Sequence, residues 1–197
     1  MSLAGHKCQA FYSNVPGIPI VFLHGLSYTI DVWHSIGVTD LLVEKHVPFL
    51  ALDMPYGLKS NCQPKTRDPQ TNVSVVAEAV KNVFGETDPV LVGASIGGNI
   101  ALRYASEKPV KGLLLIAPAR ALNNDLICVY SKFKFPVRII WGSNDNFISG
   151  EEMRTLANKI PNAKLLVYSG ASHSAYLNQP ERFKQDLLEL YVNAEQA

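Results

Sequence analysis

Three side chains of this sequence could together carry out acyl transfer: a serine, an aspartate and a histidine. Ser95 stands in the stretch GASIG at 93–97, which has the pattern G-x-S-x-G. A nucleophilic serine on a strained turn from strand to helix needs very small residues two positions away, because the turn lifts its hydroxyl clear of the sheet. The same pattern also suits a glycine-rich turn with a capping serine, so the motif alone does not decide between them.

An aspartate and a histidine follow two later apolar runs, at places that suit partners of the serine. Asp145 follows the run at 137–141, and His173 lies in the segment SGASHSAY after the run at 165–168. The histidine could take the proton of Ser95, and the aspartate could hold the histidine in the required tautomer. Taken singly, Asp145 also suits a plain turn and His173 a solvent-facing loop. Asp53 is a rival carboxylate, and we expect it to order its own loop instead.

Acyl transfer by a serine also needs two N–H groups aimed at the oxyanion that develops on the carbonyl oxygen. Ile96 directly follows the serine, and Leu26 follows His24 and Gly25 after an apolar run at 20–23. We therefore expect the backbone N–H groups of Leu26 and Ile96 to form the oxyanion hole. His24 is expected to brace this loop through a hydrogen bond and not to act as the base.

The elements that would position these residues follow from the apolar runs of the sequence. Short apolar runs without clean alternation occur at 18–25, 47–55, 89–95, 111–118, 136–145 and 163–170. Such runs are typical of parallel strands that are covered on both faces. Helical spacing is clear at 70–84 and 179–192, and 28–46 and 150–160 are also expected to be helical.

The alternation of strands and helices predicts an α/β fold with a doubly wound, mostly parallel sheet flanked by helices. The segment KCQAFYS at 7–13 could add an antiparallel edge strand. Ligands of doubly wound sheets bind beyond the carboxyl ends of the strands. Ser95, Asp145 and His173 all stand at such ends, so we expect them to meet.

Five segments resemble the α/β-hydrolase superfamily, and the resemblance covers the chain from about residue 18 onward. They are FLHG at 22–25, LDMPYGLKS at 52–60, LVGASIGG at 91–98, IIWGSND at 139–145 and GASHSAYLNQPERF at 170–183. The order serine, aspartate, histidine is also that of this superfamily. The resemblance implies Ser95 as nucleophile, His173 as base and Asp145 as the residue that orients the base. It also implies Leu26 and Ile96 as the oxyanion donors.

The sequence departs from the superfamily pattern at two places. Tyr56 and Leu58 stand where glycines are usual, which puts the shape of the loop at 53–60 in doubt. Most relatives also insert a helical lid where this chain has only a short insert at 118–135. The chain thus resembles the compact, nearly lidless members, whose open site suits small acyl groups or an acyl group presented on a larger partner. The residues expected to line the pocket are Tyr28, Tyr56, Asn99 and Tyr176.

Composition narrows the remaining possibilities. The 197 residues suit a single domain spanning 1–197, and a net charge of +1 without a basic cluster argues against nucleic-acid binding. No apolar run is long enough to cross a membrane. The three cysteines are far apart and show no C-x-x-C spacing, which argues against a disulfide framework or a zinc site. We therefore expect free, mostly buried thiols and a cytoplasmic protein.

The leading hypothesis is a serine hydrolase that cleaves carboxylic esters or related small acyl compounds through an acyl-enzyme. It needs no metal or organic cofactor, and its expected partner is a small-molecule acyl substrate; no feature of the sequence indicates a protein partner. Two alternatives stay open. The acyl group could pass to a nucleophile other than water, or the fold could be a non-catalytic scaffold that binds a small molecule or a protein.

Overall fold

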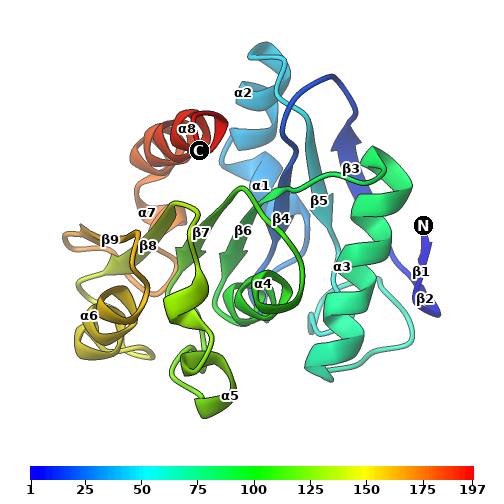
Figure 1. The fold of residues 1–197 in the computed structure, drawn as a ribbon. Coiled ribbons are helices and arrows are strands. Elements are labelled where there is room, and N and C mark those ends of the chain that lie inside the picture. Colours follow the sequence, from blue (N-terminus) through cyan, green and yellow to red (C-terminus); the bar gives the residue numbers. More distant parts are fainter.

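A seven-stranded, mostly parallel sheet forms the centre of the molecule in the computed structural model, which describes residues 1–197 (Figure 1). The strand order is β3-β5-β4-β6-β7-β8-β9, and only β3 runs antiparallel to its neighbour. The bounds are Ala10–Ser13 for β3, Ile20–Leu23 for β4, Phe49–Leu52 for β5, Val90–Ala94 for β6, Gly112–Ile116 for β7, Val137–Gly142 for β8 and Ala163–Tyr168 for β9. The fold class is therefore the one that the apolar runs predict, with the expected edge strand.

Helices cover both faces of this sheet (Figure 1). One face carries α3 (Pro69–Phe84), α4 (Ile96–Glu107), α5 (Asn124–Ile127) and α6 (Gly150–Lys159), and the other carries α1 (Asp31–Ser35), α2 (Val38–Glu44), α7 (Ala175–Asn178) and α8 (Pro180–Glu195). Successive strand residues alternate between the two cores: Val21 and Leu23 pack on one side, Ile20 and Phe22 on the other. Because both sides are apolar, the strands read as unbroken hydrophobic runs.

The insert between β7 and β8 contains no lid domain. It holds only the short helix α5 and a 3-10 turn, η1, at Tyr130–Lys132. Tyr130 is buried, and its hydroxyl donates a hydrogen bond of 2.6 Å to the carbonyl oxygen of Ala121. The insert is thus packed against the body of the protein and leaves the carboxyl ends of the strands open.

The N-terminal residues form a feature that the sequence did not indicate. Strands β1 (Ser2–Leu3) and β2 (His6–Lys7) make a two-stranded hairpin, and Lys7 bridges to Gln63. This contact brings Cys8 and Cys62 together, and they form a disulfide. The expectation of three free, mostly buried thiols is therefore wrong, because the pairing depends on packing across 54 residues of sequence. Cys128 alone is free, and it is exposed.

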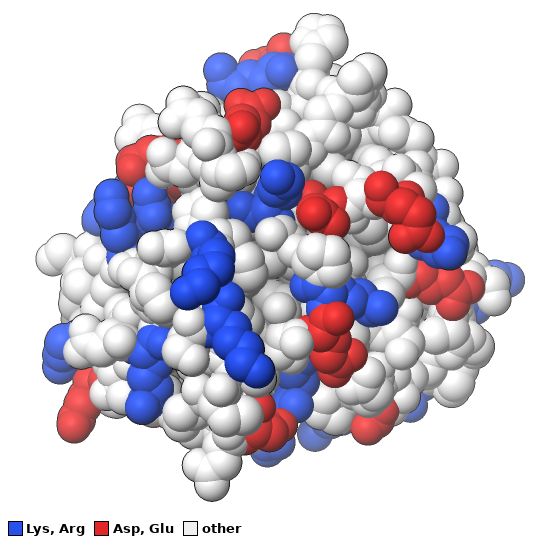
Figure 2. Space-filling view, in the orientation of Figure 1, with Lys and Arg blue, Asp and Glu red and all other residues white.

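Charged side chains of both signs are intermixed on the surface seen in Figure 2. This distribution agrees with the near-neutral net charge of +1. None of the helices combines the length and the apolar composition that a membrane-spanning helix needs.

Candidate active site

Ser95 occupies a strained turn between β6 and α4. Its backbone has φ 52° and ψ −112°, a region that residues with a side chain rarely adopt. The N–H group of Ser95 donates to the carbonyl of Ile116 at 2.8 Å, and the carbonyl of Ser95 accepts from the N–H of Ala119 at 3.0 Å. Strain of this kind persists where surrounding structure over-determines the backbone, and it is common at functional sites.

The glycines around Ser95 are required by close backbone contacts. A Cβ atom added to Gly93 would collide with the backbone of Gly97, and one added to Gly97 would collide with the carbonyl oxygen of Leu23. Helix α4 therefore begins directly against the ends of β4 and β6. Only residues without a side chain leave enough space for this turn, as expected from the sequence. The turn directs the first residues of α4 at the carboxyl edge of the sheet.

Asp145 and His173 are joined by a hydrogen bond although 28 residues separate them. The Nδ1 atom of His173 lies 2.7 Å from Oδ2 of Asp145. The other carboxylate oxygen, Oδ1, accepts from the backbone N–H groups of Phe147 at 2.8 Å and Ile148 at 3.0 Å. The side chain of Asp145 is fully buried, whereas that of His173 is 22% exposed. The carboxylate is thus fixed from three sides, and the histidine reaches the pocket.

The two loops that carry this pair pack against one another without intervening side chains. A Cβ atom on Gly142, at the end of β8, would collide with the carbonyl oxygens of Ala171 and Ser172. The N–H group of Asn144 also donates to the carbonyl of Ala171 at 2.9 Å. Close approach of the two backbones therefore sets the short distance between Asp145 and His173.

The loop after β4 presents a backbone N–H group that has no acceptor within the protein. The carbonyl of Leu26 accepts from the N–H of Leu58 at 2.9 Å, but the N–H of Leu26 makes no hydrogen bond. Ile96 is the first residue of α4, where a helix leaves its N–H groups unpaired. Both residues are thus free to bind an anionic oxygen, and the partial positive charge at the start of α4 favours one there.

His24 braces this loop from below and does not reach the pocket. Its ring is fully buried, its Nδ1 atom lies 2.8 Å from the carbonyl oxygen of Gly25, and its Nε2 atom accepts from the N–H of Met54 at 2.9 Å. Asp53 lies beneath it, with Oδ1 3.4 Å from Nε2 of His24. Burial alone would raise the pKa of Asp53, but the neighbouring His24 ring and the hydrogen bond from the N–H of Asn61 outweigh it and lower this pKa.

A pocket of about 480 Å³ opens over Ser95 and His173. This volume is within the range of small-molecule sites. The lining residues come from five segments at the carboxyl edge of the sheet: 25–28, Ala94 and Ser95, Ala119, Asn144 with 146–148, and 172–174 with Tyr176. The sheet therefore brings the expected serine, histidine and Leu26 into one cavity, with Asp145 directly behind the histidine.

Two of the four expected wall residues line the pocket, and two do not. Tyr28 and Tyr176 line it, and the Tyr28 hydroxyl is 2.9 Å from Oγ of Ser174. Tyr56 is buried and donates a hydrogen bond of 2.6 Å to the carbonyl of His24. Asn99 is also buried and donates to the carbonyl of Ala119 at 3.0 Å. Contrary to expectation, these two side chains brace the backbone around the pocket.

Phe147 lines the pocket, although no pattern in the sequence indicates it. Its side chain is 80% exposed, and its ring lies beside that of His173 with a centroid distance of 5.1 Å. Its own N–H group holds the carboxylate of Asp145. The only hint in the sequence is that an aromatic residue follows the candidate triad aspartate, Asp145, by two positions.

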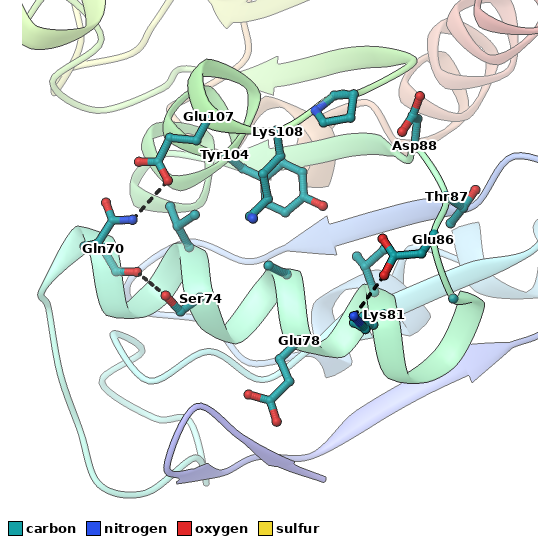
Figure 3. A pocket seen from close by; sticks show the side chains of 15 residues that line it. Gln70, Ser74, Glu78, Lys81, Glu86, Thr87, Asp88, Tyr104, Glu107 and Lys108 are labelled. Atoms are coloured by element: carbon teal, nitrogen blue, oxygen red, sulfur yellow. Dashed lines mark hydrogen bonds and ion pairs between the residues drawn. The ribbon is translucent and has the colours of Figure 1, made fainter.

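A second hollow of about 580 Å³ lies between α3, α4 and the segment 85–88 (Figure 3). Two pairs of side chains interact there: Lys81 with Glu86 at 2.9 Å, and the amide of Gln70, which donates to Glu107 at 3.0 Å. Burial raises the pKa of Tyr104, which lines it, to about 12. None of the candidate triad residues faces this hollow, so the smaller pocket over Ser95 is the candidate active site.

The sequence is similar to one protein family and to several named proteins. A family model described as the alpha/beta hydrolase family matches residues 20–138. The chain is 28% identical to "Protein ABHD14A" of Danio rerio over 180 residues, which is 89% of this chain and 64% of that protein. It is 27% identical to the human protein named "Putative protein-lysine deacylase ABHD14B" over 177 residues, 86% of this chain and 81% of that protein. The chain thus spans somewhat less than two thirds of the Danio protein.

A solved structure shares the fold at low sequence identity. It is titled a "predicted CIB-like hydrolase" from Thermoplasma acidophilum, and it superposes with a TM-score of 0.84 at 21% identity, over 95% of this chain and 93% of that one.

Proposed function

The chain belongs to the alpha/beta hydrolase family, and from this premise we propose that it is a serine hydrolase with Ser95, His173 and Asp145 as its triad. The observation that carries the proposal is the hydrogen bond of 2.7 Å between His173 Nδ1 and buried Asp145, in the same pocket edge as the strained Ser95. Nothing in a merely structural turn requires these three groups to converge.

The first half of the reaction follows from this geometry. Because Asp145 accepts a hydrogen bond from the N–H group at Nδ1 of His173, the Nε2 atom of the ring carries a free lone pair. In the proposed mechanism, Nε2 takes the hydroxyl proton of Ser95 as Oγ attacks the carbonyl carbon of the substrate. The oxyanion that forms is held by the N–H groups of Leu26 and Ile96. The histidine then gives the proton to the leaving group, and an acyl-enzyme on Ser95 remains.

The second half repeats these steps with water as the nucleophile. His173 removes a proton from the water as the water oxygen attacks the acyl carbon, and the same two N–H groups hold the tetrahedral oxyanion. His173 then returns the proton to Oγ of Ser95 as the bond between Oγ and the acyl carbon breaks and the acid leaves. Asp145 stabilises the positive charge that His173 gains in both halves. The protein groups alone supply the acid, the base and the electrophilic stabilisation, so the scheme requires no metal or organic cofactor.

The open pocket supports a short acyl group as the substrate of this reaction. No lid covers the carboxyl edge of the sheet, and the pocket of about 480 Å³ is only moderately large. Carboxylic esters of small acids are the class that we propose. Transfer of the acyl group to an amine or thiol would use the same residues, because it differs only in the nucleophile that enters the second half.

Acylated lysine is a second candidate substrate, and it is favoured by the relatives. Proteins at 27–28% identity carry the name "Putative protein-lysine deacylase", and the chain covers 81% of them. An acyl group at the end of a lysine side chain could reach an open pocket. The exposed ring of Phe147 would then contact the peptide that carries this lysine. The amine of an amide leaves only after it is protonated, whereas the alcohol of an ester leaves more readily. Proton donation by His173 would therefore be more important for the cleavage of an amide.

Ester turnover by the wild-type protein and by Ser95→Ala tests the proposed function. With p-nitrophenyl acetate, the substitution should lower kcat by about 10⁴- to 10⁶-fold, the loss typical of a removed triad nucleophile. An acetyl-lysine peptide in parallel assays reports on the second candidate, and added amine or thiol reports on acyl transfer through the products formed. Undiminished turnover by Ser95→Ala in a folded sample would exclude Ser95 as the nucleophile.

A further inference from the structure

The hydroxyl group of Tyr176 is buried beside the candidate active site and has no partner. Tyr176 lines the pocket over Ser95, yet only 1% of the residue is exposed. Its oxygen is one of four buried side-chain nitrogen or oxygen atoms that make no hydrogen bond in this structure. An unpaired buried hydroxyl costs free energy, so proteins rarely keep one without a reason.

The ring of Tyr176 is held rigidly, which prevents the hydroxyl from moving to find an acceptor. It stacks on Trp33 with a centroid distance of 5.2 Å and an interplanar angle of 28°, and it also packs on Phe183 at 5.9 Å. The edge contact with Tyr28 is 6.4 Å. Burial raises the pKa of Tyr176, with a smaller contribution from Tyr28, so the hydroxyl keeps its proton and remains a donor at neutral pH.

The neighbouring hydroxyl groups are already engaged with other partners. The Tyr28 hydroxyl pairs with Oγ of Ser174 at 2.9 Å, and the Tyr56 hydroxyl donates to the carbonyl of His24 at 2.6 Å. Both lie near Tyr176: after burial, Tyr28 is the next cause of the raised pKa of Tyr176, and Tyr176 is the next cause of the raised pKa of Tyr56. The protein itself offers the Tyr176 hydroxyl no acceptor, and Tyr176 lines the pocket, so a molecule bound there is placed to supply one.

The remaining lining limits what that molecule can be. No Asp, Glu, Lys or Arg lines the pocket, and its polar groups other than His173 are serines, asparagines and tyrosines. A carboxylate on the acyl group would therefore be buried without a cation. A neutral oxygen, such as a ketone or an ether, could accept a hydrogen bond without this cost.

We propose that Tyr176 is a specificity residue whose hydroxyl donates a hydrogen bond to a neutral oxygen in the acyl group of the substrate. The preferred substrates are then short oxo- or alkoxy-acyl compounds, ahead of alkyl chains of the same shape. This inference rests on the proposed function, because it names the acyl groups that the same pocket would prefer.

Two nearly isosteric esters test the inference: p-nitrophenyl 4-oxopentanoate, and p-nitrophenyl 4-methylpentanoate, in which a methyl group replaces the ketone oxygen. After correction for their rates with hydroxide, the wild type should prefer the oxo ester in kcat/KM by up to about tenfold, the effect of one neutral hydrogen bond. Tyr176→Phe should abolish this preference by lowering kcat/KM for the oxo ester relative to the methyl ester. Tyr12→Phe, which removes an exposed hydroxyl on edge strand β3, should keep it.

The outcomes separate this inference from the proposed function. If the wild type cleaves both esters and Tyr176→Phe keeps the preference, the assignment of Tyr176 is overturned and the hydrolase stands. If the wild type cleaves neither ester and Ser95 is unreactive, the proposed function fails and takes this inference with it. Melting temperature gives a further check: Tyr176→Phe should melt at or above the wild-type temperature, because it loses an unpaired hydroxyl. A clear fall would mean that the protein itself pairs this group, which would overturn the inference.

Discussion

Asp145→Asn is the substitution whose effect can be worked out most fully from the structure. Oδ1 of Asp145 accepts from two backbone N–H groups, and Oδ2 faces Nδ1 of His173. In the variant, the side-chain NH₂ cannot face two N–H donors, so it must take the place of Oδ2. There it donates to Nδ1 of His173, which forces the ring proton onto Nε2. A ring in this tautomer cannot accept the proton of Ser95.

The size of the rate loss distinguishes this explanation from a simpler one. If Asp145 sets the tautomer, kcat should fall about 10⁴-fold, as for the same change in a serine protease triad, which corresponds to about 5.4 kcal/mol. If Asp145 contributed only one charge-assisted hydrogen bond, the loss would be about 1.5–3 kcal/mol, or roughly 10- to 150-fold. The variant keeps both backbone hydrogen bonds to Oδ1, so it should fold.

The assay is steady-state hydrolysis of p-nitrophenyl acetate, with melting temperature as the check on folding. Asp186→Asn is the matched control, because Asp186 accepts a hydrogen bond of 2.6 Å from Tyr168 and lies on α8, away from the pocket. The control should keep kcat within about twofold of the wild type, as expected of a site remote from the chemistry. A folded Asp145→Asn variant that loses no more than about 150-fold in kcat would refute the tautomer-setting role given to Asp145.

Three further changes have expected outcomes. Gly97→Ala should destabilise the protein by about 1–3 kcal/mol and abolish turnover, since the added methyl collides with the carbonyl of Leu23; chemical denaturation and ester assays measure both effects. Phe147→Ala should change stability by less than about 0.5 kcal/mol, because the ring is 80% exposed, yet raise KM for aryl esters several-fold; equal KM values would remove Phe147 from the pocket wall. Reduction of the disulfide between Cys8 and Cys62 should lower unfolding free energy by about 4 kcal/mol, the loop-closure value for a separation of 54 residues. Two additional titratable thiols in unfolded, unreduced protein would show that this disulfide is absent.

The fold was readable from the sequence because every strand of the parallel sheet is buried on both faces. Each of the six apolar runs coincides with one strand between β4 and β9, and each of the stretches with helical spacing contains a helix. The meeting of Ser95, Asp145 and His173 also followed from a simple rule, since parallel strands end at one edge of the sheet.

Side-chain direction was not readable in the same way. Tyr56 and Asn99 are polar residues near the candidate nucleophile in sequence, but both turn inward and hydrogen-bond to backbone carbonyls of the loops at His24 and Ala119. The local backbone decides this direction, and no sequence pattern reports it. The disulfide was missed for a related reason, because Cys8 meets Cys62 only after the N-terminal hairpin has packed on the distant segment around Gln63.

Covalent labelling shows whether Ser95 is an activated nucleophile. Folded wild-type protein should react with one equivalent of a fluorophosphonate probe, and peptide mass mapping should find the adduct on Ser95. Ser95→Ala should take up no probe, and Asp145→Asn should react far more slowly. Absence of any adduct in the folded wild type would favour a non-catalytic scaffold, and an adduct on another residue would exclude Ser95 as the nucleophile.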